Sequence, residues 1–347
     1  MEAIKQHLEL GLDTFGDVTA GADGQPLPQA RVIRNIVEEA TLADRVGVDF
    51  IGVGEHHRED FAVCAPEVVL AAIAARTTRI RMASAVTVLS SDDPVRVFER
   101  FATLHAISNG RAEVMLGRGS FIESFPLFGY DLNQYEELFD EKLDLFAKLL
   151  TEERITWRGN TRAALEDQRV FPRIEKGSLV TWIGVGGTPE SVVRAAHYGM
   201  PLMLSIIGGD PARFQPLVDL YRRALAQFGK PDLPIGLHSP GYVADTDEQA
   251  RAELFPDYKS MRDRIGAERG WRGAMTRADF DREAEHGSLY VGSPETVARR
   301  IAATAKRFGL ARFNLKYSAG MLGHEKLMRC IELYGTRVIP LVRELLS

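Results

Sequence analysis

The sequence predicts a single (β/α)₈ barrel, a TIM barrel with insertions, over residues 1–347. Short apolar segments typical of buried strands alternate with amphipathic segments along the chain, eight of each. No linker separates these alternations, which favours a closed barrel over a doubly wound open sheet. Hydrophobic residues make up 45% of the chain and charged residues 26%, the ordinary balance of a globular protein with a sizeable core.

The first half of the chain supplies four strands and four helices. The first helix is predicted because Val32, Ile36, Ala40 and Ala43 share one face at helical spacing, and the third strand because its apolar run suits burial on both sides. Strands are predicted at Glu9–Thr14, Phe50–Gly54, Ile80–Leu89 and Ala112–Gly117. Helices are predicted at Arg31–Val46, Pro66–Arg76, Val95–Ile107 and around Phe139–Leu150.

The second half repeats the alternation and carries two insertions. Residues 154–177 read as an excursion with short β-like pieces, and residues 265–293 as a long polar loop that could form a lid. Pro294–Phe308 is predicted to add an extra helix. Strands are predicted at Leu179–Val185, Leu202–Ile207, Ile235–Ala244 and Arg312–Tyr317. Helices are predicted at Glu190–Tyr198, Ala212–Phe228, Asp247–Arg264 and Gly323–Leu346.

Charge, cysteines and hydropathy exclude several classes of protein. The net charge of -5 is spread over mixed residues, so the chain offers no basic patch for nucleic acid. Cys64 and Cys330 both lie in helix-like patterns and are expected to be buried free thiols, which fits a reducing cytoplasm. No signal-peptide pattern and no apolar run of membrane-spanning length is present. We therefore expect a soluble cytoplasmic protein.

The segment after the second strand carries the strongest chemical signal. In a barrel the active site lies at the carboxyl ends of the strands, and Glu55, His56 and His57 directly follow G-V-G there. Acid–base chemistry is the first interpretation, with His56 as the catalytic residue. Glu55 and His57 could instead bind a metal, although no convincing third ligand appears, or all three could hydrogen-bond neighbouring loops.

Two glycine-containing segments at the same barrel end are candidate phosphate sites. Arg118 lies between glycines after the fourth strand, where a guanidinium could reach an anion or simply occupy a surface turn. After the fifth strand, Gly186 and Gly187 leave room for phosphate before a helix that Thr188 is placed to cap and that contains Ser191. A similar capping sequence recurs at Ser293. The competing interpretation is therefore that Thr188 only caps a helix and that the segment binds no phosphate. Neither segment has the spacing of a Rossmann or Walker motif.

Taken together, these motifs resemble the bacterial luciferase-like flavin monooxygenases. The resemblance runs through E-H-H, A-S-A-V-T-V-L-S-S-D-D-P-V-R, G-R-G-S-F-I-E-S-F-P-L-F-G and G-V-G-G-T-P-E-S-V-V-R-A-A-H-Y-G-M-P-L-M-L. It ends with Y-V-G-S-P-E-T-V-A-R-R-I and the last helix, and so covers nearly the whole chain. It implies the same barrel fold, with flavin mononucleotide (FMN) held at the carboxyl ends of the strands.

The resemblance also implies roles for particular residues. His56 would be the active-site histidine, and Ala85 and Val86 would lie beneath the flavin ring, where the family often has a cis peptide bond. Arg118, Gly187, Thr188 and Ser191 would hold the phosphate. One departure is Glu136, because luciferase-like proteins can place a second phosphate-binding arginine there, early in the fourth helix.

The chemistry that the resemblance implies is oxygenation of a small organic substrate with O₂ and reduced FMN. A separate NAD(P)H:flavin reductase would supply the reduced flavin, and the chain would dimerise through apolar residues such as Val68–Ala75. One alternative is hydride transfer with a deazaflavin coenzyme. Another is a flavin carrier without catalysis, since a shared fold does not guarantee an active site.

Overall fold

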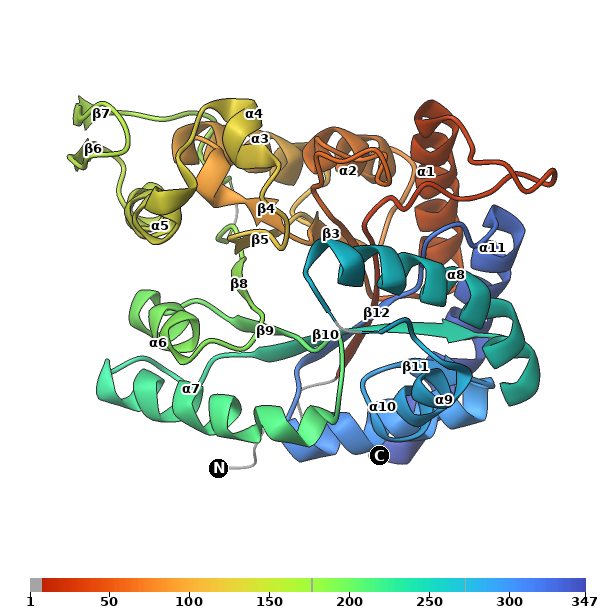
Figure 1. The fold of residues 1–347 in the computed structure, drawn as a ribbon. Coiled ribbons are helices and arrows are strands. Elements are labelled where there is room, and N and C mark those ends of the chain that lie inside the picture. Colours follow the sequence, from red (N-terminus) through yellow and green to blue (C-terminus); the bar gives the residue numbers. More distant parts are fainter. Residues whose placement is uncertain (1–7, 176, 272) are drawn as a thin grey trace.

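A barrel of parallel strands lies at the centre of the molecule, with helices on its outside (Figure 1). The computed structural model describes residues 8–175, 177–271 and 273–347. Neighbouring strands follow the order β3-β2-β1-β12-β10-β9-β8-β5-β4. Met82 of β3 bridges to Ala112 just before β5, which brings the first strand of this order beside β5 and nearly closes the barrel. The strands are β1 (Glu9–Thr14), β2 (Phe50–Val53), β3 (Arg81–Ser84), β4 (Thr87–Val88), β5 (Val114–Gly117), β8 (Thr181–Val185), β9 (Leu202–Ser205), β10 (Ile235–Val243) and β12 (Arg312–Lys316). The predicted barrel is confirmed.

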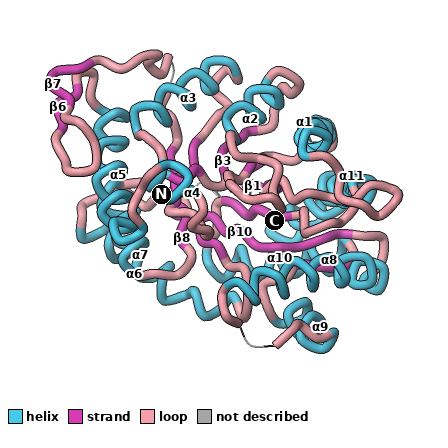
Figure 2. Tube along the Cα trace, turned by 45° about the horizontal axis from the view of Figure 1, so that its top comes forward, coloured by secondary structure: helices cyan, strands magenta, loops and turns pink. Residues whose placement is uncertain are grey.

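Helices surround the strands, as Figure 2 shows. In α1 the side chains of Val32, Ile36, Ala40 and Ala43 are buried, which is the face that their spacing predicts. The helices of the first seven repeats are α1 (Gln29–Arg45), α2 (Pro66–Ala74), α3 (Pro94–Ile107), α5 (Tyr135–Thr151), α6 (Pro189–Tyr198), α7 (Gln215–Gln227) and α8 (Asp247–Glu268), and α10 (Pro294–Phe308) comes in addition before β12. Short α4 (Ser124–Phe128) lies between β5 and α5. The additional helix over 294–308 is thus confirmed.

The third predicted strand is broken. Its first part, β3, pairs with β2, and Ala85 N still donates to Val53 O at 2.8 Å. Its second part, β4, pairs with β5 instead, with Thr87 opposite Leu116. The uninterrupted strand predicted over 80–89 is therefore wrong, because the segment changes its partner strand between these two residues.

The long loop predicted over 265–293 is also wrong. The helix α8 continues to Glu268, α9 spans Arg277–His286, and the short strand β11 (Tyr290–Gly292) pairs with β10. Thr276 and Asp279 form a capping box that starts α9. Only Phe280 and Ala284 of α9 are buried, so a helix with so little apolar surface resembles a polar loop in sequence.

Smaller differences lie elsewhere in the chain. The last predicted helix is divided into α11 (His324–Leu333), a π-helical segment over Tyr334–Val338 and α12 (Ile339–Leu346). The excursion contains an antiparallel pair, β6 (Ile155–Trp157) and β7 (Leu165–Gln168), as its β-like pieces predict. Cys330 is buried in α11 as predicted, but the burial predicted for Cys64 is wrong, because this residue lies outside α2 in the preceding loop, where its side chain is exposed. No helix in the described part of the chain has the length and hydropathy needed to cross a membrane.

A buried ion-pair network closes the amino-terminal end of the barrel. Arg312 is 1% exposed, and its two terminal nitrogens donate to the Glu113 carboxylate at 2.9 and 3.0 Å. Its Nε donates to Glu9 at 2.7 Å, and Trp182 Nε1 donates to Glu113 at 2.7 Å. Burial alone would raise the pKa of Glu113, but Arg312 outweighs it and holds that pKa below 4.5. Both buried charges are therefore paired.

Candidate active site

His56 lies at the carboxyl end of β2 among aromatic rings. The rings of Phe61, Phe15 and Phe121 have their centroids 4.3, 4.9 and 5.5 Å from the imidazole. Burial in these surroundings lowers the pKa of His56 to about 3, although Asp17 opposes the shift. The imidazole is therefore neutral at neutral pH, and its Nδ1 is buried without a partner. An unpaired buried polar atom at a barrel mouth suits a ligand.

The neighbouring residues Glu55 and His57 bind each other. The Nε2 of His57 lies 2.9 Å from Oε1 of Glu55, and the other oxygen of Glu55 accepts a hydrogen bond from Val88 N at 2.8 Å. Among the described residues, no group of three or more His, Cys, Asp and Glu side chains is placed to hold a metal ion. This geometry favours the third interpretation, hydrogen bonding that fixes the loop to β4.

A second cluster, the arginine pocket, surrounds the amino end of α6. Arg118 follows β5, and its Nη2 donates to Thr188 Oγ1 at 3.3 Å and to Ser191 Oγ at 3.2 Å. Its Nη1 forms an ion pair with Glu136, whose second oxygen lies 3.3 Å from Nη2 of Arg194. A single carboxylate thus joins two guanidinium groups, which otherwise have the charge and fork geometry to bind a phosphate.

The amino end of α6 has no side-chain cap. Thr188 is the N-cap residue as predicted, yet its hydroxyl donates to Ser191 Oγ at 2.7 Å rather than accepting from a backbone N–H. At the start of α10, in contrast, Ser293 Oγ accepts from Thr296 N at 3.3 Å. The two segments that looked alike in sequence therefore differ, because only α6 leaves its first N–H groups available to an anion.

Glycines open the approach to the arginine pocket. A Cβ atom on Gly186 would meet no atom within 4 Å. Gly187 has φ +131°, a backbone conformation that residues with a side chain rarely adopt. Deeper in the barrel, the peptide bond between Ala85 and Val86 is cis, as the resemblance implies. A Cβ on Gly117 would come within 2.6 Å of the Val86 side chain. Gly186 and Gly187 thus leave open space beside the arginine pocket, whereas Gly117 allows β5 to pack closely against Val86.

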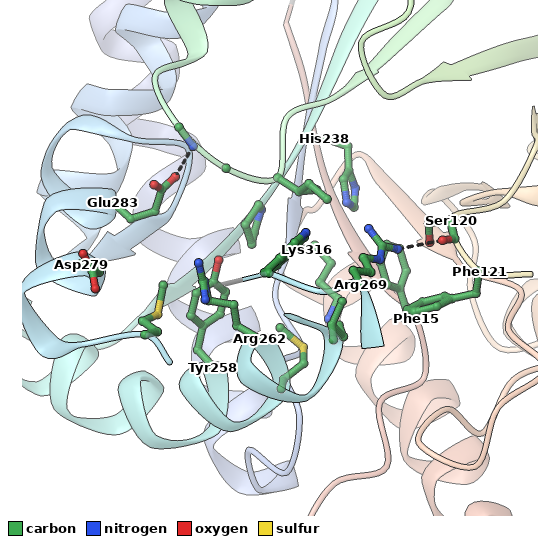
Figure 3. A pocket seen from close by; sticks show the side chains of 18 of the residues that line it. Phe15, Ser120, Phe121, His238, Tyr258, Arg262, Arg269, Asp279, Glu283 and Lys316 are labelled. Atoms are coloured by element: carbon green, nitrogen blue, oxygen red, sulfur yellow. Dashed lines mark hydrogen bonds between the residues drawn. The ribbon is translucent and has the colours of Figure 1, made fainter. Parts of the chain in front are cut away.

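Beyond the aromatic rings lies the substrate-side cavity, with a volume of about 460 Å³ (Figure 3). Its inner wall contains Phe15, His238 and Lys316, and its outer wall comes from α8, α9 and the segment between them. The Nδ1 of His238 lies 2.6 Å from Oδ2 of the buried Asp13, and Asn314 donates to the other oxygen at 3.1 Å. A carboxylate that fixes one imidazole nitrogen turns the other toward a ligand, an arrangement suited to proton transfer.

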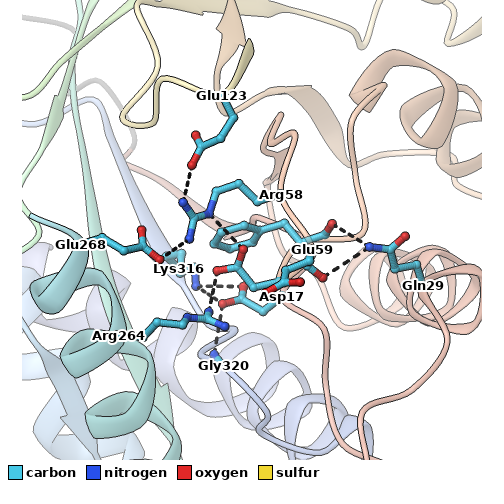
Figure 4. A network of polar contacts seen from close by, with 11 residues as sticks. Asp17, Gln29, Arg58, Glu59, Glu123, Arg264, Glu268, Lys316 and Gly320 are labelled. Atoms are coloured by element: carbon cyan, nitrogen blue, oxygen red, sulfur yellow. Dashed lines mark hydrogen bonds and ion pairs between the residues drawn. The ribbon is translucent and has the colours of Figure 1, made fainter. Parts of the chain in front are cut away.

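Salt bridges fasten the outer wall of this cavity to the barrel (Figure 4). Arg58, from the loop after β2, donates to Glu268 at 2.7 Å and to Asp60 at 3.0 Å and pairs with Glu123. Arg264 of α8 binds the other oxygen of Asp60 at 2.5 Å. The carboxyl end of α8 is thus held across the barrel mouth.

The structure brings the predicted residues into three places and adds others. His56 lies in the aromatic cluster, Ala85 and Val86 in the floor, and the remaining predicted cofactor residues around the arginine pocket. Sequence reasoning missed Arg194 and His238. Arg194 lies three residues after Ser191 and therefore on the same helix face, which was a usable signal. His238 is one polar residue in an apolar strand, and its partner Asp13 is 225 positions away.

Comparison with known proteins gives one family. The family model for luciferase-like monooxygenases matches residues 14–312. A 4-hydroxyprotoasukamycin monooxygenase from Streptomyces nodosus subsp. asukaensis is 26% identical over 321 residues, which cover 88% of this chain and 85% of that protein. A limonene 1,2-monooxygenase from Rhodococcus erythropolis is 27% identical, covering 86% of this chain and 79% of that protein.

Solved structures of the same fold include proteins with different cofactors. A monooxygenase from Streptomyces bottropensis has a TM-score of 0.82 at 23% identity and covers 96% of this chain and 99% of its own. The oxygenating constituent of a Pseudomonas putida 3,6-diketocamphane monooxygenase, in complex with FMN, has a TM-score of 0.76 at 18% identity. An F420-dependent secondary alcohol dehydrogenase has a TM-score of 0.75 at 16% identity, and each of these two covers 96% of this chain and 99% of its own. With the family model spanning most of the barrel, the chain belongs to the luciferase-like monooxygenase family and is an oxidoreductase.

Proposed function

We propose that the protein is an FMN-dependent monooxygenase that uses reduced FMN and O₂ to oxygenate a small organic substrate. The observation that carries this proposal is the arginine pocket at the uncapped amino end of α6, where Arg118 binds Thr188 and Ser191. Backbone N–H groups, two hydroxyls and a guanidinium suit the phosphate of FMN. Reduced FMN would supply the electrons that O₂ needs to react.

The residues of this chain divide the remaining tasks between them. Arg118, Arg194, Thr188 and Ser191 hold the phosphate, with Gly186 and Gly187 leaving room for it. The Ala85–Val86 segment supports the flavin ring. The phenylalanines around His56 keep water away from the site, which limits hydrolysis and other side reactions during oxygenation.

The two histidines have different tasks in this proposal. His56 is neutral, so it contributes a hydrogen bond from its unpaired side rather than a charge. His238, whose ring Asp13 orients, exchanges a proton with the substrate at the nitrogen that faces the cavity. Reduced FMN comes from a separate NAD(P)H:flavin reductase, and two copies of the chain associate through the face of α2 that contains the exposed Val68.

Hydride transfer with a deazaflavin coenzyme is the second candidate. Its support is the fold similarity to the F420-dependent dehydrogenase, which is as high as that to the FMN-bound monooxygenase constituent. A hydride-transfer enzyme needs no oxygen, and this difference separates the candidates experimentally.

Anaerobic calorimetric titration of the purified protein with reduced FMN, oxidised FMN and coenzyme F420 tests the proposal. We expect reduced FMN to bind at least about tenfold more tightly than F420, a difference of about 1.4 kcal/mol. Tighter binding of F420 would move the function to hydride transfer. Failure of all three to bind would overturn the flavin proposal.

A further inference from the structure

The substrate-side cavity is distinct from the arginine pocket. None of the residues that contact one another around the amino end of α6 lines it. Its volume of about 460 Å³ is in the range of pockets that hold small organic molecules. Aromatic side chains from opposite sides line it, with Phe15, Phe61 and Phe121 from the barrel and Tyr258 and Trp271 from the outer wall. A planar apolar body fits these walls.

The acidic residues of the cavity are already engaged. Asp279 accepts from Thr276 N at 3.0 Å and forms an ion pair with Arg282. Glu283 accepts from Gly209 N at 2.7 Å, from Ser288 N at 2.9 Å and from Ser288 Oγ at 3.2 Å, all at its Oε1. Arg282 neutralises the charge of Asp279, and three protein donors already stabilise the charge of Glu283, which reduces what either carboxylate offers to a cationic ligand.

One basic residue of the inner wall is also engaged. Lys316 donates to both oxygens of Asp17 at 2.9 Å. Since its charge is neutralised there, Lys316 does not set the charge preference of the cavity.

Two other basic residues keep unused donors. Arg269 gives one hydrogen bond, to Ser120 O at 2.7 Å, and its guanidinium lies 5.3 Å from the Phe121 ring and 5.9 Å from the Trp271 ring. Arg262 lies 5.4 Å from the Trp271 ring, and Asp263, its nearest acidic neighbour among the described residues, is 3.7 Å away. A guanidinium has five N–H donors, so the described residues leave most donors of both side chains available to a ligand.

The charge and the walls together define a ligand class. Figure 3 shows Arg262 and Arg269 extending toward the space that His238 and Phe15 border from the barrel side. Stacking against aromatic rings holds a guanidinium flat, which favours two parallel hydrogen bonds to a carboxylate. We propose that this cavity binds an aromatic organic anion, with Arg262 and Arg269 binding its carboxylate and Phe121 and Trp271 contacting its ring. This proposal rests on the proposed function, which makes such an anion the substrate class.

Calorimetry on the FMN-saturated protein with three probes of similar shape tests the proposal. The probes are 2-naphthoate, the neutral 2-naphthalenemethanol and the cationic 2-naphthylmethylammonium. We expect the naphthoate to bind about tenfold more tightly than the alcohol and the ammonium to bind most weakly. Equal affinities, preference for the ammonium, or no binding of any probe would each overturn the proposal.

Substitutions identify the residues responsible. In Arg269→Met and Arg262→Met we expect the preference for naphthoate over the alcohol to fall about threefold to tenfold each. The matched control is Arg277→Met, because Arg277 also stacks on aromatic rings and pairs with Asp281 but does not line the cavity. In Trp271→Ala both naphthoate and the alcohol should bind more weakly, and the preference for naphthoate should also fall, because Trp271 helps to orient Arg262 and Arg269. An unchanged preference in both arginine variants would overturn the proposal.

The same titrations without FMN separate this proposal from the proposed function. If naphthoate is preferred but FMN does not bind, the anion site stands and the flavin proposal fails. If FMN binds and the naphthoate preference is absent, the anion site fails alone. If FMN displaces naphthoate, the cavity belongs to the flavin ring, and the anion proposal is overturned.

Discussion

The two ends of the barrel use charged residues in opposite ways. At the amino-terminal end, Arg312 binds Glu9 and Glu113 and lies over the Phe50 and Trp182 rings, so its donors are all directed at protein atoms. At the carboxyl end, Arg262 and Arg269 keep free donors, and the Nδ1 of His56 has no partner. Fully paired buried charges contribute to a unique fold, whereas unpaired polar groups in a concave site indicate a ligand.

The largest effect that we expect is on stability, from Arg312→Met at the amino-terminal end. The variant removes the buried partner of Glu113 and leaves that buried carboxylate with the half-exposed Arg81 as its remaining ion-pair partner, which should lower the free energy of unfolding by about 3–5 kcal/mol. Urea denaturation measures this loss. Arg158→Met is the control, since Arg158 and its partner Glu166 are 78% and 79% exposed and the loss of this pair should cost about 1 kcal/mol or less. Equal losses in both variants would contradict the difference between buried and exposed charges.

At the carboxyl end, His56→Ala should affect chemistry rather than stability. We expect the rate at which oxygen reoxidises the enzyme-bound reduced flavin to fall about a hundredfold, while the affinity for FMN stays within about threefold of that of the parent protein. Stopped-flow absorbance measures the rate. Because burial lowers the pKa of His56 to about 3, the imidazole acts as a neutral group, and His56→Asn should restore most of the rate.

The pH dependence and a matched control sharpen this test. A break in the pH–rate profile between about pH 5 and 8 cannot come from a group whose pKa is about 3, so it should persist in His56→Ala. His105→Ala is the control, because burial also lowers the pKa of His105, which lies in α3. Loss of the break in His56→Ala alone would contradict the neutral role.

The smallest expected effect comes from Glu136, whose side chain is 59% exposed. Its carboxylate binds Arg118 and Arg194 and would compete with a phosphate, so Glu136→Gln should strengthen FMN binding about threefold to tenfold. Fluorescence titration with FMN and with riboflavin, which lacks the phosphate, measures the effect, and riboflavin affinity should not change. Glu137→Gln is the control, since Glu137 contacts Asn160 instead. Weaker FMN binding in Glu136→Gln would mean that the carboxylate helps to hold the cofactor.

Local sequence patterns predicted the repeats of the barrel and pointed to most residues of the candidate site. Strand β12 and the capped start of α10 depend on neighbouring residues, and the glycines around Arg118 and Thr188 pointed to the segments that form the arginine pocket. Other features depend on distant contacts. The pairing of His238 with Asp13 joins β10 to β1, and α9 is recognisable only once Phe280 is seen to be buried beneath α8. The unused cap of Thr188 likewise depends on Arg118, which is 70 residues away.

The ratio of FMN to riboflavin affinity, in the parent protein and in Arg118→Met, tests the central claim most directly. If the arginine pocket binds the cofactor phosphate, the parent should bind FMN at least about tenfold more tightly than riboflavin, and Arg118→Met should reduce this ratio to about two or less. Riboflavin binding by the variant reports whether the rest of the site remains intact. A ratio that stays at its parent value in Arg118→Met would contradict the assignment of this pocket to the phosphate.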